Sequence, residues 1–216
     1  MKKMKTKMQT NFAKCIRGYH LVNDKPIKES VWEDINAIVL KASGIQVTSE
    51  SNGSHKPGGD IVCSLGGLSN KSAVYTKNKI KISSYRLTTA CSNKSPGDIN
   101  QIVSEINKRK NFDYYSVIVR DETLGHIKYD WMMIPSDHDA FNPALYKWSQ
   151  TINKKNEVTG WFTDKINGSS MCINFSMSSQ LWITVEITDE LKKFITGTCQ
   201  VAREKKYDYI TLSDLL

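Results

Sequence analysis

The residues with the clearest chemical potential are an aspartate and a lysine in neighbouring segments of strand character. Asp60 opens the first segment, and Ser69, Asn70 and Lys71 lie in the second. The pair Gly66-Gly67 between the segments predicts a tight turn and therefore a hairpin. Positions 69 and 71 share one face because side chains alternate along a strand. The hairpin thus predicts that Asp60, Ser69 and Lys71 lie close together, with the Asn70 carbonyl as a further oxygen.

These groups suit the metal-assisted hydrolysis of a phosphodiester. That reaction needs a carboxylate to hold Mg²⁺, a second oxygen ligand, and a lysine that orients the attacking water or offsets phosphate charge. Asp60 and the Asn70 carbonyl would be the ligands, Lys71 would be the lysine, and Ser69 would assist. Asp60 could instead merely cap a turn, and Lys71 could be an edge-strand lysine that blocks aggregation.

The wider motif resembles a known family of nucleases. Pro57-Gly58-Gly59-Asp60, followed after eight residues by Ser69-Asn70-Lys71, is similar to the signature of the PD-(D/E)XK nucleases, which include most type II restriction endonucleases. The resemblance implies that Asp60 binds metal, that Lys71 is the catalytic lysine and that Glu33 supplies an auxiliary acid to the metal. Position 69 normally has Glu or Asp. Its serine is a poorer Mg²⁺ ligand, so the metal would depend more on carbonyl, water and another acid.

The resemblance also implies partners and a cofactor. The cofactor would be Mg²⁺ and the substrate double-stranded DNA, cut at specific sequences. A restriction system further implies a cognate DNA methyltransferase, and the enzyme could act as a homodimer.

Positive charge is concentrated in the first half of the chain. Residues 1–110 hold 19 Lys and Arg against 8 Asp and Glu, whereas residues 111–216 hold 11 against 14. No acid lies between Asp60 and Asp98, a stretch that holds six basic residues. Such a stretch suits a polyanion, although a solvated basic face is the alternative. We expect DNA contacts from His55, Lys56, Lys79, Lys81, Tyr85 and Arg86, and base reading in the less basic half from Asn174, Ser178, Ser179 and Gln180.

Apolar spacing and capping residues predict three helices besides a short one near the start of the chain. The start of the chain, to about Lys28, is expected to be irregular apart from a short helix over Thr10–Arg17. Ser30 is the expected N-cap of a helix that buries Val31, Trp32, Ile35, Ile38 and Val39 and ends near Ser43-Gly44. Pro96 is expected to open a second helix, and Thr188 to cap a third that continues through Ile195.

The remaining apolar segments are expected to be strands. Asp60–Leu65, Leu68–Tyr75 and Lys79–Leu87 predict an antiparallel meander. Tyr115–Val119 predicts a buried strand paired with Ile127–Ile134. More strands are expected at Gly160–Phe162, Met171–Phe175 and Leu181–Ile187. The fold class predicted is α/β, with a mixed β-sheet core flanked by helices as in restriction endonucleases.

The chain of 216 residues has no linker-like stretch, so a single endonuclease domain over 1–216 is expected. Its catalytic hairpin would span about 60–87 and its base-reading region about 111–187. No apolar run is long enough for a membrane span and no secretion signal opens the chain, so a cytoplasmic protein is expected. The five cysteines lack zinc spacing, and nucleotide-binding and acyl-transfer motifs are absent from the sequence.

Two other functions stay open at this point. The first is a catalytically silent DNA-binding or regulatory module, which Ser69 in place of an acid favours. The second is an enzyme of another type whose basic first half binds RNA or another anionic substrate.

Overall fold

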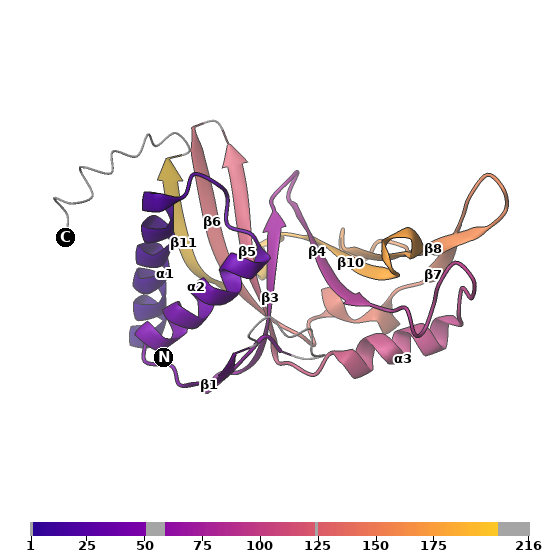
Figure 1. Cartoon of the computed structure of the whole chain (residues 1–216), viewed down its shortest axis with the longest axis horizontal. Coiled ribbons are helices and arrows are strands. Elements are labelled where there is room, and N and C mark those ends of the chain that lie inside the picture. Colours follow the sequence, from indigo (N-terminus) through magenta and orange to yellow (C-terminus); the bar gives the residue numbers. More distant parts are fainter. Residues whose placement is uncertain (1, 51–58, 124, 203–216) are drawn as a thin grey trace.

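Two β-sheets form the framework of the chain (Figure 1). The structure is a computed structural model that describes residues 2–50, 59–123 and 125–202. In spatial order the six-stranded sheet contains β1 (Val47–Glu50), β2 (Ile61–Cys63), β3 (Gly66–Val74), β5 (Tyr114–Thr123), β6 (His126–Pro135) and β11 (Ile195–Ala202). The five-stranded sheet contains β4 (Lys79–Arg86), β10 (Gln180–Glu186), β9 (Ser170–Asn174), β8 (Val158–Thr163) and β7 (Trp148–Ile152).

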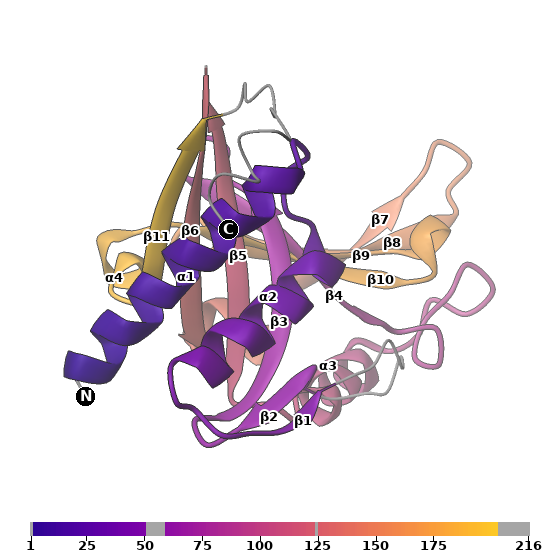
Figure 2. The same ribbon diagram turned by 60° about the vertical axis from the view of Figure 1, so that its left-hand side comes forward.

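The first sheet is mixed because β3 and β5 run parallel, whereas every pair in the second sheet is antiparallel. Helices α1 (Lys2–Val22) and α2 (Glu29–Ala42) lie side by side against the six-stranded sheet (Figures 1 and 2). The shorter helical elements are α3 (Ile99–Arg109), α4 (Asp189–Lys192), η1 (Asp139–Phe141), η2 (Pro143–Leu145) and η3 (Phe175–Met177). The prediction of a mixed α/β fold flanked by helices is confirmed.

Two hydrophobic cores hold these layers together. One lies between the helices and the six-stranded sheet, where the rings of Phe12, Trp32 and Trp131 pack with centroids 5.6 to 5.9 Å apart. The other lies between the sheets and includes Ile82 from β4 and Val117 from β5. The second core exists because β3 and β4, adjacent in sequence, belong to different sheets.

The first helix is much longer than the predicted Thr10–Arg17. It spans Lys2–Val22 and buries Met8, Phe12, Ile16 and His20 at intervals of four residues. An apolar stripe with one buried residue in four is narrow, and lysines occupy many of the other positions in the first two turns. The stripe packs against the six-stranded sheet and helix α2, for example Phe12 against Trp131 and Trp32. The expectation of an irregular start was therefore wrong.

The second helix occurs where it was expected, with a different cap and a different buried face. It begins at Glu29 with Lys28 as the N-cap residue, which makes no side-chain capping hydrogen bond, so Ser30 is not the cap. Ile38 is 55% exposed rather than buried, whereas Asn36 is fully buried. The end at Ser43 is as predicted.

The hairpin that carries Asp60 and Lys71 is present, although its turn differs from the prediction. Cys63 pairs with Gly66, so the turn is Ser64-Leu65 and the glycine pair begins β3. Gly66 has φ +120, and a Cβ there would lie 2.5 Å from the Asp113 carboxylate. Both this positive φ and the close packing against Asp113 therefore require glycine, although Gly66 lies outside the turn.

The predicted three-stranded meander is wrong. After β3 the chain turns through Lys77 and Asn78, which both have positive φ, and β4 pairs with β10 of the other sheet. Ile80 and Ile82 are thereby buried between the sheets. β2 pairs with β3 only as far as Leu68, so beyond Leu68 this edge of β3 has no partner strand. The candidate site lies at this unpaired edge.

The later elements follow the prediction with corrected ends. Asp98, not Pro96, caps α3 by accepting hydrogen bonds from the backbone N–H groups of residues 100 and 101. Thr188 caps α4 as predicted, but the helix stops at Lys192 and Ile195 begins β11. Strands β5 and β6 pair as expected, and β8, β9 and β10 occur as expected with β7 added. Among the described helices, none is long and apolar enough to cross a membrane.

Candidate active site

The hairpin fixes Asp60 through its own backbone. The Asp60 N–H donates to the Leu68 carbonyl at 2.7 Å, and the Asp60 carboxylate accepts from the Asn70 N–H at 2.5 Å. The Ser69 side chain makes a further hydrogen bond with the carboxylate. Asp60 is thus held against β3 immediately before β2 begins.

The same geometry sets the direction of the Asn70 carbonyl. Along a strand, the N–H and C=O of one residue point to the same neighbouring side. The Asn70 N–H points to Asp60, so its backbone carbonyl also lies on the open edge that Asp60 faces. This is the oxygen that the sequence predicts as an additional metal ligand.

Lys71 reaches from the same edge to helix α2. Its ammonium donates to the Glu29 carboxylate at 2.9 Å, and the lysine side chain is only 12% exposed. Glu29 and Glu33 are four residues apart on α2, so both side chains lie on one face of that helix. The helix therefore brings two acids to the lysine and the aspartate of the hairpin.

The acids of this group affect one another's protonation. Burial, together with the charges of Asp60 and Glu29, raises the pKa of Glu33 from 4.5 to about 7. Burial also raises the pKa of Asp60, and the Glu29 charge acts in the same direction. Lys71 and the hydrogen bonds from residues 70 and 69 oppose that rise. These side chains therefore influence one another through their charges. The group, called the acid cluster below, consists of Asp60, Glu33, Glu29 and the neighbouring Lys71.

A buried polar contact lies behind this unit. The Asn36 amide of α2 donates to the Asn70 side-chain oxygen at 2.6 Å and to the Ser116 hydroxyl at 2.8 Å. Trp131 donates to the same hydroxyl at 3.0 Å, and both asparagines are fully buried. The side chain of Asn70 therefore attaches α2 to β3, while its backbone holds Asp60.

Ser69 lies beside the proposed metal ligand Asp60. It is 5% exposed, and its side chain bonds the Asp60 carboxylate. Ser69 can therefore orient the aspartate, and its assistance to a metal stays a prediction.

The donors present suit Mg²⁺. Within the described ranges, no three or more His, Cys, Asp or Glu side chains are grouped closely enough to hold a metal. Mg²⁺ does not require such a cage, because it keeps several waters and binds through one or two carboxylates together with substrate phosphates. Asp60, Glu33 and the Asn70 carbonyl offer only oxygen, and a divalent cation would relieve the repulsion that raises the pKa of Glu33. The donor chemistry therefore fits the metal that the sequence predicts.

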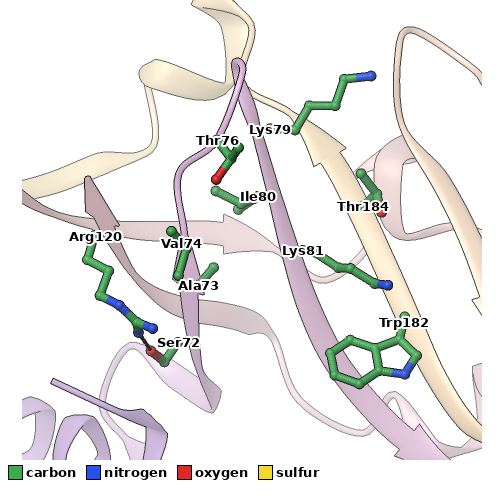
Figure 3. A pocket seen from close by; sticks show the side chains of 10 residues that line it. All are labelled: Ser72, Ala73, Val74, Thr76, Lys79, Ile80, Lys81, Arg120, Trp182 and Thr184. Atoms are coloured by element: carbon green, nitrogen blue, oxygen red, sulfur yellow. Dashed lines mark hydrogen bonds between the residues drawn. The ribbon is translucent and has the colours of Figure 1, made fainter. Parts of the chain in front are cut away.

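Among the described residues, those predicted to contact DNA from the first half of the chain do not gather around the acid cluster. His55 and Lys56 fall outside the described residues. Lys79 and Lys81, on β4, line a hollow of about 390 Å³ to which both sheets contribute residues (Figure 3). The Lys79 ammonium is 3.5 Å from the Glu186 carboxylate, and the Lys81 ammonium lies 4.9 Å from the ring centroid of Trp182.

The stretch without acids in the sequence is therefore not free of acids in space. Glu29 neutralises Lys71, and Glu186 lies beside Lys79. Lys81 and Arg86 are exposed. These two basic side chains are the better placed of the set for phosphate contacts.

The side chains of two predicted base-reading residues, Ser179 and Gln180, make hydrogen bonds within the protein. The Ser179 hydroxyl is buried and donates to the Cys91 carbonyl at 2.6 Å, so its expected DNA contact is corrected. The Gln180 amide donates to the Ser84 and Tyr85 carbonyls and thereby joins β10 to β4. Gln180 is half-buried and these bonds occupy its amide nitrogen, so its expected role in base reading stays a prediction.

The other three residues predicted to contact DNA differ in exposure: Tyr85 is half-buried, whereas Asn174 and Ser178 are exposed. The Tyr85 hydroxyl lies 3.5 Å from that of Tyr115, and burial raises the pKa of Tyr85, so this phenol points inward. Asn174 accepts hydrogen bonds from the N–H and hydroxyl of Ser176 while its side chain stays exposed. Ser178 is exposed in the left-handed conformation.

Sequence reasoning missed Glu29, Trp182 and Arg120. Glu29 had a detectable signal, since it precedes Glu33 by one helical turn. Arg120 donates to the Ser72 hydroxyl at 3.0 Å and lines the same hollow as Trp182. Nothing in the neighbouring sequence marked Arg120 or Trp182 as part of a site, because residues of both sheets form the hollow.

In comparisons with known proteins, no family model, no curated protein and no solved structure matches this chain. The functional conclusion therefore depends on the residues of the site.

Proposed function

We propose that this chain is a magnesium-dependent, site-specific endonuclease that cuts double-stranded DNA. The observation that carries the proposal is the convergence of Asp60 and Lys71 with Glu33 and Glu29. The first pair comes from the hairpin and the second from helix α2, and the Lys71 ammonium is 2.9 Å from the Glu29 carboxylate. A hydrolytic metal site needs such acids and a cation at one accessible edge.

Each residue has a defined task in this proposal. Asp60, Glu33 and the Asn70 carbonyl would hold Mg²⁺, and bound Mg²⁺ supplies Lewis-acid activation of water and of a phosphate oxygen. Lys71 holds a positive charge beside the phosphate and orients the attacking water. Glu29 keeps that ammonium in place before the substrate enters. Ser69 and the Asn70 N–H hold the Asp60 carboxylate in one orientation.

The arrangement of the elements supports a restriction-endonuclease-like fold. Helix α2 precedes the hairpin, α3 follows β4, and β5 returns parallel to β3 in the same mixed sheet. A restriction enzyme would act in the cytoplasm beside a cognate DNA methyltransferase. Its sites are commonly palindromic, so a homodimer is part of the proposal.

A DNA-binding or regulatory module without catalysis is the second candidate. Serine at position 69 favours it, as does the lack of a preformed group of three metal-binding side chains among the described residues. Under this candidate Asp60 and Lys71 would stabilise the hairpin and nothing more. The two functions differ in whether DNA is cut.

A plasmid-nicking assay tests the proposal. The full chain with Mg²⁺ should convert supercoiled plasmid to nicked and linear forms, and EDTA should abolish this conversion. Asp60→Ala and Lys71→Ala should each lower the rate by about a hundredfold or more, as general acid–base groups typically do. DNA affinity without metal should hold or rise in Asp60→Ala, because a negative group leaves the phosphate site.

Lys192→Ala is the matched control. Lys192 pairs with Asp189 at 2.9 Å on α4 and is exposed, so its loss removes the same charge from another surface. Circular dichroism and thermal unfolding check that the variants fold. Cleavage by Lys71→Ala within about tenfold of the unsubstituted chain, or cleavage that EDTA leaves intact, contradicts the proposal.

A further inference from the structure

One face of the five-stranded sheet carries aromatic and basic side chains that the proposed cleavage does not use. Along β10, Leu181, Ile183 and Val185 are buried toward the core between the sheets. Trp182 and Thr184 alternate with them and point to the opposite face, where they remain partly exposed. This opposite face is called the outer face below.

The strand register places two rings in one row on the outer face. Trp182 pairs with Cys172, and Cys172 pairs with Phe162. Residues directly opposite each other on neighbouring strands share a face. Phe162 is 45% exposed, and two strand spacings place it roughly 10 Å from Trp182 along the row. Each ring can therefore accept a separate planar group.

The charge on this sheet suits an anionic partner. Its five strands contain Lys79, Lys81 and Arg86 but only one acid, Glu186, at the end of β10. Lys81 is exposed, with its ammonium 4.9 Å from the Trp182 ring centroid. Such a cation–π contact is weak at an exposed site, so the ammonium can move to a phosphate.

A hollow adjoins the outer face. The hollow of about 390 Å³ is lined by Lys81 and Trp182 on one side and by Ser72 and Arg120 on the other (Figure 3). The basic side chains of Lys81 and Arg120 extend the surface that an anionic strand could contact.

We propose that the outer face binds single-stranded DNA, with unpaired bases stacked on Trp182 and Phe162 and phosphates beside Lys81 and Arg86. Bases in a duplex already stack on one another, whereas aromatic rings on a flat sheet bind base faces that are free. This binding does not depend on the proposed nuclease function.

Fluorescence anisotropy in EDTA measures this binding without cleavage. The probe is a labelled oligothymidine of about 12 nucleotides, within the usual range of site sizes, and the comparison is a blunt duplex of equal length. Trp182→Ala and Phe162→Ala should each weaken oligothymidine binding by about five- to a hundredfold, the range of one lost base stack. Duplex binding should change much less.

Three variants separate stacking from other causes. Trp182→Phe keeps a ring and should retain most of the affinity, which also checks that loss in Trp182→Ala is not a folding defect. Ile152→Ala removes an exposed aliphatic side chain from β7 of the same sheet and should leave binding unchanged. Lys192→Ala removes an exposed charge from α4 and should bind oligothymidine normally. Because binding is measured in EDTA, a failed nuclease assay and a failed binding assay are distinguishable.

Three results overturn the proposal. The unsubstituted chain could fail to bind oligothymidine. Trp182→Ala could bind it as tightly as the unsubstituted chain. The alanine variants could also lose duplex and single-strand binding equally, which would assign the rings to a duplex surface.

Discussion

The Lys71 ammonium of β3 lies 2.9 Å from the Glu29 carboxylate of α2, although the two residues are 42 positions apart in the chain. This ion pair connects the hairpin to the helix that carries Glu33. The lysine side chain is 12% exposed and the glutamate 37%, so the pair lies at the boundary between core and solvent. Its consequences for Glu33 can be measured.

Glu29→Gln should lower the pKa of Glu33. The Glu29 charge raises that pKa, and Lys71, freed from its partner, would lower it further. Carboxyl ¹³C NMR titration of Glu33 measures the change. Asp34→Asn is the matched control, because Asp34 contributes the smallest of the charge effects that raise this pKa. An equal shift in both variants, or none in Glu29→Gln, contradicts the assigned contact.

Stability should fall as the pH rises from about 4.5 to about 7. The pKa of Glu33 in the folded chain is about 7 against an ordinary 4.5, so the folded state binds more protons than the unfolded state within this window. The free energy of unfolding therefore decreases with pH there and levels off above it. Urea unfolding at several pH values measures this slope.

Glu33→Gln should flatten that slope and stabilise the chain at pH 8. Glu190→Gln, at an exposed position of α4, should leave the slope unchanged. Mg²⁺ should bind more tightly as the pH rises past 7, because the Glu33 proton must leave first. A slope that survives in Glu33→Gln would assign the titration to other groups, with Asp60 the first to test.

Asn36→Ala should destabilise the fold by about 1 to 3 kcal/mol, the cost of leaving a buried polar partner unsatisfied. Asn36 donates to the Asn70 side chain at 2.6 Å, and both residues are fully buried. Asn36→Leu with Asn70→Leu should cost less than the sum of the single changes, because neither amide is then left alone. Urea unfolding of the double-mutant cycle measures the coupling. Additive costs would show that the two amides do not interact.

Lys81→Ala should reduce the salt dependence of DNA binding by about one phosphate contact. Lys79→Ala should reduce it less, because its ammonium already lies 3.5 Å from Glu186. Glu186→Gln should raise the salt slope by freeing Lys79. Affinity measured over a series of salt concentrations gives these slopes, with Lys192→Ala as the control. Equal slopes for the Lys79 and Lys81 variants would contradict the pairing.

The local sequence was sufficient for the hairpin and for the main strands of the six-stranded sheet. The Gly66-Gly67 pair between two segments of strand character predicted the β2–β3 hairpin, although the turn itself is Ser64-Leu65. Asp60 and Lys71 could therefore be placed together before the fold was known. β5 was recognisable as well, because it contains an apolar run that is buried on both faces of the sheet. These features depend on neighbours a few residues apart, which the sequence records directly.

Only the tertiary structure decided which elements meet. β4 has the same alternating pattern as a third meander strand, yet it pairs with β10 of the five-stranded sheet, and Ile80 and Ile82 are buried in the core between the two sheets. That departure leaves the edge of β3 open, lets Glu29 reach Lys71, and brings Trp182 to the hollow beside Ser72. The alternation of a strand specifies a buried face but not the partner that buries it, and such long-range pairing is settled by packing of the whole chain.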